Sequence, residues 1–206
     1  GNRIDPPGYT REPIGRAIAR VAHTYGVTHA IPFSSLHKYQ RADSVWAKPY
    51  SAALDDYRTG FESDQSELLP AYVRYDCLTD SVDEINPPAS PNIVLDPAEF
   101  GDDWSETLEQ KEVEAVNKYF GEIEHLGARM GFIYMRVDGE NNFIEFRNKG
   151  LNKGIMFEVP RHSLMRAMRY EIFDDLLIGN FMKTRLVGNW PKSMLYPQFT
   201  PYVGKY

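Results

Sequence analysis

The residues best suited to chemistry are concentrated in one short stretch near the start of the chain. The polar and charged side chains of that stretch are Ser34, Ser35, His37, Lys38, Arg41 and Asp43. The planar guanidinium of an arginine can donate two parallel hydrogen bonds to a carboxylate or a phosphate. We therefore predict that the two serines, Lys38 and Arg41 bind an anionic or polyhydroxy substrate. The alternative is an ordinary solvated loop.

The sequence before this stretch predicts the elements that position it. Apolar residues recur at helical spacing after Pro13, and Gly26 is suited to end that helix. These apolar residues are Ile14, Ala17, Ile18, Val21, Ala22 and Tyr25. Residues 27–33 then predict a strand that ends at Pro32, because proline cannot donate a hydrogen bond to a strand ladder. In α/β folds, loops that leave the carboxyl end of a strand commonly carry the ligand-binding groups.

Several segments of the chain resemble one known family. The run Ile-Pro-Phe-Ser-Ser-Leu-His at 31–37 resembles the last metal-site segment of metallo-β-lactamase-fold proteins, in particular the branch that contains CMP-N-acetylneuraminate hydroxylase. The likeness returns, in the same order, at 159–164, 173–184 and 195–206. It implies an α/β fold, in which the C-terminal part of an αββα sandwich is followed by a small α+β module that resembles a sterol-carrier domain.

The resemblance also implies a metal centre. The hallmark of the family is a His-x-His-x-Asp-His cluster, whose close histidines share an ion and leave one position open for water or substrate. None of the five histidines of this chain lies within three positions of another. Either the main ligands lie upstream or the protein has lost them. We expect the first, because the chain begins at Gly1 without a methionine and the resemblance starts in the middle of the fold.

Within this chain, His37 is the candidate metal ligand. The family usually places a histidine two residues after the strand-end proline, and Ser34 occupies that position here. The resemblance implies iron or zinc, as a dinuclear centre in the complete protein. Chemistry in the hydroxylase branch is oxidative and depends on iron, whereas elsewhere in the superfamily it is mostly zinc-assisted hydrolysis. The sequence leaves both open and assigns no catalytic residue.

Composition shifts predict three regions. The resemblance implies that residues 1–86 are the C-terminal part of the metallo-β-lactamase-fold domain and that 104–206 are the appended α+β module with a C-terminal tail. Residues 87–103 form the proline-rich connection between them. The elements predicted in the first region are a helix over 50–61 and strands over 69–78 and 81–85. Those predicted in the last are a helix that begins near Ser105, strands over 131–137, 143–147 and 154–159, a helix over 160–178, and a tail over the last thirty residues.

The overall composition excludes some functions and favours one compartment. A net charge of −6 gives no global basic surface, so nucleic-acid binding is not expected. No apolar run approaches the about 20 residues that span a bilayer. The single cysteine, Cys77, excludes an internal disulfide and suits the cytoplasm.

The expected partners are of two kinds. One is a small-molecule substrate, and the other is the missing N-terminal part of the same polypeptide or a complementary subunit. A different class of function also stays open, namely a non-catalytic binding or assembly module. Such a module would dock its partner on the apolar side of the helix between Leu164 and Leu177.

Overall fold

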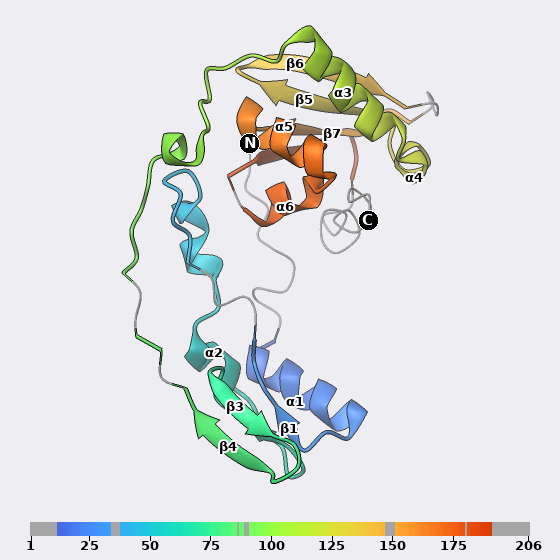
Figure 1. Cartoon of the computed structure of the whole chain (residues 1–206). Coiled ribbons are helices and arrows are strands. Elements are labelled where there is room, and N and C mark those ends of the chain that lie inside the picture. Colours follow the sequence, from blue (N-terminus) through green and yellow to red (C-terminus); the bar gives the residue numbers. More distant parts are fainter. Residues whose placement is uncertain are drawn as a thin grey trace. The chain divides into compact units, whose positions relative to one another are not determined.

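The computed structural model describes residues 12–33, 38–85, 87–88, 91–146, 151–179 and 181–190, with Tyr50 described by its backbone alone. It is a mixed α/β structure that divides into two compact units (Figure 1). The N-terminal unit comprises 8–40 and 47–93, and the C-terminal unit comprises 1–7, 41–46 and 94–206. The division near 93 falls within the proline-rich stretch. The assignment of 41–46 to the C-terminal unit was not expected from the sequence.

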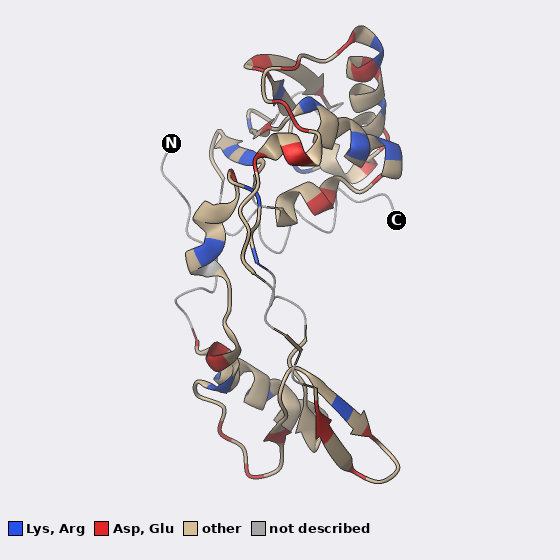
Figure 2. Ribbon diagram, turned by 60° about the vertical axis from the view of Figure 1, so that its left-hand side comes forward, with Lys and Arg blue, Asp and Glu red and all other residues tan. Residues whose placement is uncertain are grey.

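The N-terminal unit is built from short elements. In chain order they are α1 (Ile14–Tyr25), β1 (His29–Ala30), η1 (Val45–Tyr50, whose first two residues belong to the C-terminal unit), α2 (Leu54–Arg58), β2 (Glu67–Leu68), β3 (Val73–Asp76) and β4 (Ser81–Glu84). Strands β1 and β2 pair in parallel, and β3 and β4 form an antiparallel hairpin. Acidic and basic residues are interspersed along this unit and along the C-terminal unit (Figure 2).

Several predictions for the N-terminal unit need correction. The strand predicted over 27–33 contains only the two residues of β1, because Pro32 has no N–H to donate to its partner strand. The helix predicted over 50–61 is the five-residue α2. The strand predicted over 69–78 is the four-residue β3, and β2 was not predicted. The helix α1 and its end at Gly26, where φ is +64°, are confirmed.

The buried face of α1 also differs from the predicted apolar face. Its buried residues are Gly15, Ala19 and Ala22, whereas Val21 and Tyr25 are exposed. A Cβ atom on Gly15 would lie 2.5 Å from the carbonyl oxygen of Thr59, so the helix approaches the backbone after α2 very closely. Only small side chains fit at such a contact.

The C-terminal unit contains one four-stranded sheet and its helices. In chain order its elements are η2 (Pro97–Phe100), α3 (Gln110–Gly121), α4 (Glu124–Gly127), β5 (Phe132–Val137), β6 (Glu140–Glu145), β7 (Gly154–Glu158), α5 (Arg161–Tyr170), α6 (Phe173–Ile178) and β8 (Lys183–Val187). The strand order is β6-β5-β7-β8, in which β5 and β7 are parallel and the two outer pairs are antiparallel.

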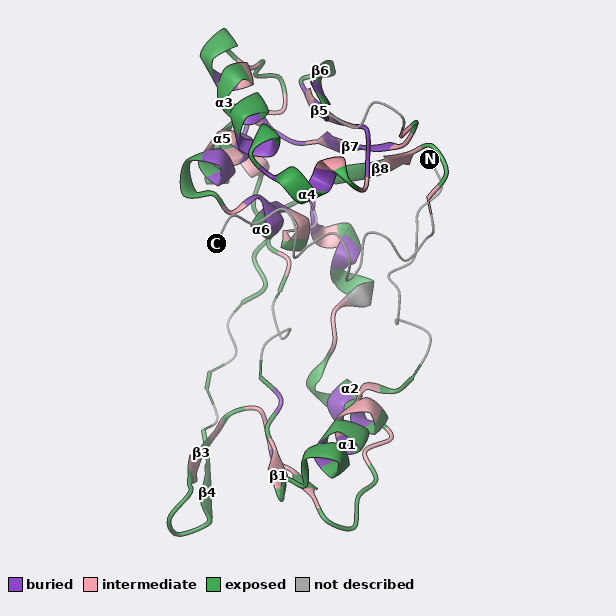
Figure 3. Cartoon of the chain, turned by 90° about the vertical axis from the view of Figure 1, so that its right-hand side faces the viewer, coloured by how far each residue is buried: buried purple, intermediate pink, exposed green. Residues whose placement is uncertain are grey.

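The core of this unit lies between one face of the sheet and the helices. Alternate residues of β5, including Ile133 and Met135, are fully buried, and they pack in one cluster with Phe120 of α3, Leu164 of α5 and Phe173 of α6. Figure 3 shows that buried residues are concentrated in these elements. The sequence predicted this helix, three-strand and helix order, and the structure adds β8 as a fourth strand.

Three boundaries in the C-terminal unit differ from the prediction. The helix expected to begin near Ser105 begins at Gln110, because Ser105 is held in a turn by its backbone and hydroxyl hydrogen bonds to Asp103. The single helix predicted over 160–178 is split into α5 and α6 at Glu171, where φ is +58°. The turn between β5 and β6 is only two residues long, which a positive φ at Asp138 permits.

Candidate functional site

Of the residues that the sequence predicted to form one site, the structure describes Lys38 and Arg41. Ser34, Ser35 and His37 lie outside the described residues. Lys38 is exposed and belongs to the N-terminal unit, whereas Arg41 belongs to the C-terminal unit. The roles predicted for these residues stay predictions. The described residues next to this stretch form a pocket, which is the candidate site.

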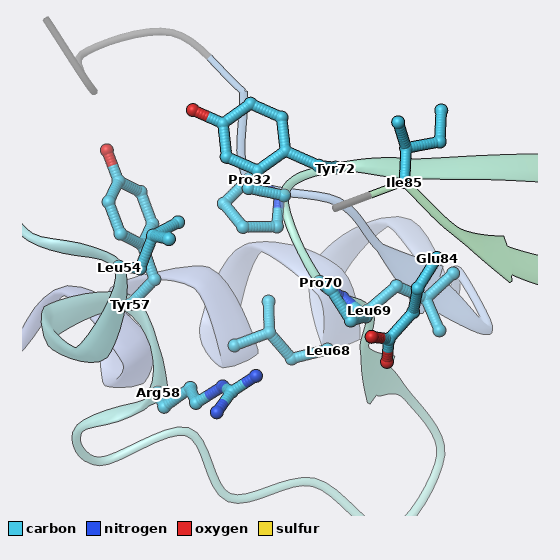
Figure 4. A pocket seen from close by; sticks show the side chains of 11 residues that line it. Pro32, Leu54, Tyr57, Arg58, Leu68, Leu69, Pro70, Tyr72, Glu84 and Ile85 are labelled. Atoms are coloured by element: carbon cyan, nitrogen blue, oxygen red, sulfur yellow. The ribbon is translucent and has the colours of Figure 1, made fainter. Parts of the chain in front are cut away.

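A pocket opens in the N-terminal unit at the end of β1. Its volume is about 190 Å³. Figure 4 shows the side chains around it, which come from the segment after β1, from α2, from the segment after β2 and from the end of β4. The lining residues are Pro32, Leu54, Tyr57, Arg58, Leu68, Leu69, Pro70, Ala71, Tyr72, Glu84 and Ile85.

The position of this pocket follows from the pairing of two strands. Because β1 and β2 are parallel, with Ala30 opposite Leu68, their carboxyl ends meet at the same edge. The chain leaves that edge through Pro32 on one side and Pro70 on the other, and both prolines line the pocket. The edge beyond parallel strand ends is a common place for ligand sites in α/β proteins.

Packing beneath the pocket makes its floor rigid. Leu69 is 4% exposed and Tyr57 is 8% exposed, so both belong to the small core of the unit. The backbone of the segment that follows α2 lies directly against Gly15 of α1. The floor is therefore held by contacts between α1, α2 and the strand pair.

Two groups of opposite charge stand on different sides of the pocket. Arg58 lies on the α2 side and Glu84 on the β4 side (Figure 4). Neither forms an ion pair with another described residue. The guanidinium can hold an anionic group of a ligand, while Leu54, Tyr72 and Ile85 provide exposed apolar contacts. No local pattern in the sequence indicates Arg58 and Glu84, because only the fold brings them together.

A second polar cluster lies on the strands of the same unit. The hydroxyl of Tyr75 donates a 2.6 Å hydrogen bond to Asp80, and its oxygen lies 3.3 Å from Nδ1 of His29. The hydrogen bond to Asp80 raises the pKa of Tyr75 to about 12, because it stabilises the protonated phenol. This cluster gives His29 a structural role that joins β1 to the β3–β4 hairpin.

Arg41 has well-defined partners within the C-terminal unit. Its guanidinium forms ion pairs with Asp43, at 2.9 Å, and with Asp102, at 2.5 Å. It also lies over the ring of Phe181, with its central carbon 4.0 Å from the ring centre. Burial alone would lower the pKa of Arg41, but the hydrogen bonds to the two aspartates outweigh that effect and raise it.

The partners of Arg41 extend this network through the unit. Asp102 is buried and accepts hydrogen bonds from the backbone and the hydroxyl of Ser163, at 2.9 and 2.6 Å. The indole of Trp104 donates to Asp43 at 3.1 Å. The network thus joins segment 41–46 to the start of α5. Asp102 is 61 positions from Arg41, which is why sequence reasoning did not connect them.

The described part of the chain contains no group of three or more His, Cys, Asp or Glu side chains arranged to hold a metal ion. His37, the metal ligand that the resemblance implies, is not among the described residues. Cys77, the one cysteine of the chain, is free and exposed.

Comparisons with other proteins add no family to these observations. No family model matches the chain, and no curated protein or solved structure matches it significantly. Among the residues that the structure describes, no helix is both long and apolar enough to cross a membrane.

Proposed function

We propose that this chain contributes the C-terminal part of a metal-dependent enzyme of the metallo-β-lactamase fold, acting on a polar, anionic small molecule. The observation that carries the proposal is the pocket at the shared carboxyl edge of β1 and β2. Pro32 lines this pocket, and it directly precedes the Phe33-Ser34-Ser35-Leu36-His37 run that resembles the family's last metal-site segment.

The residues of this chain would bind and orient the substrate. Arg58 supplies a cation at the pocket, and the exposed apolar side chains of Leu54 and Ile85 exclude water from the neighbouring part of a ligand. The metal, iron or zinc in a dinuclear centre, would supply activation of water or oxygen. Its main ligands belong to the upstream part of the same polypeptide or to a complementary subunit, with His37 as the ligand from this chain.

Oxidative chemistry is placed slightly ahead of zinc-dependent hydrolysis, because the matching segments resemble the hydroxylase branch. Cytoplasmic location is part of the same proposal. The non-catalytic alternative would use the apolar side of residues 164–177 as a docking face. It is less favoured, because that side is already covered within the unit. Leu164, Phe173 and Leu176 of that side are packed in the core of the C-terminal unit.

The test compares variants of the complete protein after loading with Fe(II) or Zn(II). Oxygen uptake and acid release are measured with a panel of phosphate esters, sulfate esters and sugar nucleotides. His37→Ala should lower both the metal content and the turnover, and Arg58→Gln should mainly raise KM, because it removes binding shared by the ground and transition states.

Arg74→Gln is the matched control, since Arg74 is an exposed arginine on β3 that does not line the pocket. Oxygen uptake with iron would support hydroxylase-like chemistry, and acid release with zinc would support hydrolysis. Wild-type metal content and kinetics in both site variants would overturn the proposed site.

A further inference from the structure

The C-terminal unit contains a larger groove that plays no part in the proposed enzyme site. It has a volume of about 510 Å³ and lies among η2, α5, α6 and Phe181, which precedes β8. Its lining residues are Arg41, Glu99, Phe100, His162, Ser163, Arg166, Ala167, Ile172, Asp175, Leu176 and Phe181.

The floor of this groove is apolar and belongs to the core. Ala167, Leu176 and Phe181 are each less than 10% exposed, so the floor is fixed by the packing of the sheet and helices. Phe100 is 39% exposed and adds an accessible ring on one wall. A volume of this size, with an apolar floor and a few polar groups, suits a ligand about as large as a two-ring aromatic compound.

Two donors on α5 converge on the groove. His162 and Arg166 are four positions apart on one helix, which places their Cβ atoms roughly 5–6 Å from each other. Neither side chain forms a hydrogen bond or an ion pair with another described residue. The imidazole of His162 lies over Gly101, where a Cβ atom would come within 3.1 Å of Nε2.

The other donors of the groove are already engaged. Arg41 is paired with Asp43 and Asp102, and the hydroxyl of Ser163 donates to Asp102. His162 and Arg166 are therefore the donors that remain for a bound anion. They can hold one carboxylate, because a planar guanidinium and a neighbouring imidazole N–H match its two oxygens.

Carboxylates on other elements limit the charge that the groove accepts. Glu99 lies on η2 and Asp175 on α6, and neither is paired with a described residue. A second negative charge on the ligand would face one of them without compensation. The lining thus selects against dianions such as phosphate monoesters.

We propose that this groove binds a small monocarboxylate with an apolar, ring-sized body. The carboxylate lies against Arg166 and His162, and the apolar body lies on Phe100, Ile172 and the buried floor. This site is independent of the proposed enzyme function, because its residues all belong to the C-terminal unit.

The experiment measures the affinity of the 206-residue chain for 2-naphthoate by calorimetry and ligand fluorescence. Neutral 2-naphthamide and the dianion 2,6-naphthalenedicarboxylate have similar ring systems and serve as charge controls. We expect 2-naphthoate to bind at least about tenfold more tightly than 2-naphthamide, which lacks one charged hydrogen-bonded contact. It should also bind more tightly than the dianion, whose second carboxylate would face Glu99 or Asp175.

Two groove variants, Arg166→Gln and Phe100→Ala, and one control variant, Arg169→Gln, assign the binding to the groove. Arg166→Gln should weaken 2-naphthoate binding about tenfold, and Arg169→Gln, an exposed change on the same helix outside the groove, should leave it unchanged. Phe100→Ala should weaken 2-naphthoate and 2-naphthamide by the same factor. No binding of 2-naphthoate, equal affinity for the neutral amide, or an unchanged affinity in Arg166→Gln would each overturn the proposal.

Discussion

The two units of the chain bury their apolar residues to very different extents. In the C-terminal unit, Phe120, Ile133, Phe157 and Leu164 are completely buried between the sheet and its helices. In the N-terminal unit the largest buried side chains are Tyr57 and Leu69. The N-terminal unit also leaves many large apolar residues exposed, namely Val21, Tyr25, Val27, Ile31, Phe33, Leu54, Tyr72, Leu78, Val82, Ile85 and Ile93.

This difference has a physical cause in the sheets. Strands β5, β6 and β7 of the C-terminal unit present buried side chains to helices α3, α4, α5 and α6, so one face of the sheet becomes a continuous core. The N-terminal unit has two separate pairs of short strands, and all residues of β4 are exposed. Isolated pairs of strands bury little surface and are marginally stable in water. We therefore attribute most of the folding free energy to the C-terminal unit.

The cavities of the two units also differ in what they rest on. The pocket of the N-terminal unit is bounded by strand ends and prolines, and it rests on a small core. The groove of the C-terminal unit rests on the main core. A ligand bound in either cavity would stabilise the unit that holds it, by an amount that its concentration and affinity determine.

The largest effect is expected from Phe157→Ala in the C-terminal core. The ring is fully buried and lies 5.1 Å from that of Phe173, so its loss creates a cavity and should lower the free energy of unfolding by about 3–5 kcal/mol. The measurement is urea unfolding followed by tryptophan fluorescence. All three tryptophans, Trp46, Trp104 and Trp190, belong to the C-terminal unit, so this signal reports that unit.

Leu69→Ala is the matched change in the N-terminal unit. It should leave the tryptophan-monitored transition near its wild-type position and accelerate amide hydrogen exchange in β1 and β2. An equally large shift of the tryptophan transition by Leu69→Ala would show that the two units unfold as one, and the comparison would fail.

A smaller but still large effect is expected from Arg41→Ala. The side chain of Asp102 is completely inaccessible to solvent, and removal of Arg41 leaves its charge without a cation. Loss of one partner from a buried ion pair should destabilise the C-terminal unit by about 3 kcal/mol in the same fluorescence experiment. From the sequence alone, Arg41 is a loop cation whose loss changes substrate binding and leaves the fold intact.

The double variant Arg41→Ala with Asp102→Asn provides the control, because it removes the unpaired charge as well. It should recover part of the lost stability. If Arg41→Ala unfolds at the wild-type urea concentration, segment 41–46 does not depend on this network and its place in the C-terminal unit is not explained by it.

The sequence predicted the elements with regular apolar spacing best. The strands β5 and β7 and the apolar side of α5 and α6 were recognised, because period and burial agree there. Helix α1 was also recognised, although its buried face differs from the predicted one. Helix ends were less predictable, since turn contacts such as Asp103 with Ser105 decided them. Strand β8 was missed because Lys183, Thr184 and Arg185 are exposed and show no apolar alternation.

The candidate site was predictable only in part. Pro32 marked the end of a strand, and the structure places a pocket there. Arg58 and Glu84 reach that pocket from α2 and β4, and no local pattern indicates such long-range contacts. The partners of Arg41 are equally remote in sequence. Residue type therefore suggested the chemistry, but the fold decided which residues are available for it.

The smallest loss of stability is expected from Gly15→Ala in the N-terminal unit. Gly15→Ala places a Cβ atom 2.5 to 2.7 Å from the backbone atoms of Thr59, Phe61 and Tyr57, and backbone atoms cannot move aside as a flexible side chain can. We expect the N-terminal unit to lose about 1–3 kcal/mol, although alanine favours a helix more than glycine does.

Amide hydrogen exchange in α1, α2 and β1 should therefore accelerate, and the tryptophan-monitored transition should stay in place. Gly121→Ala in α3 is the control, because no atom outside its own helix lies within 4 Å of the added methyl group, and this change should stabilise slightly. Unchanged exchange in Gly15→Ala would contradict the close contact of α1 with the segment after α2. The small residues on the buried face of α1 would then need another cause. The expected result would show that this unit depends on close backbone packing where it lacks a large apolar core.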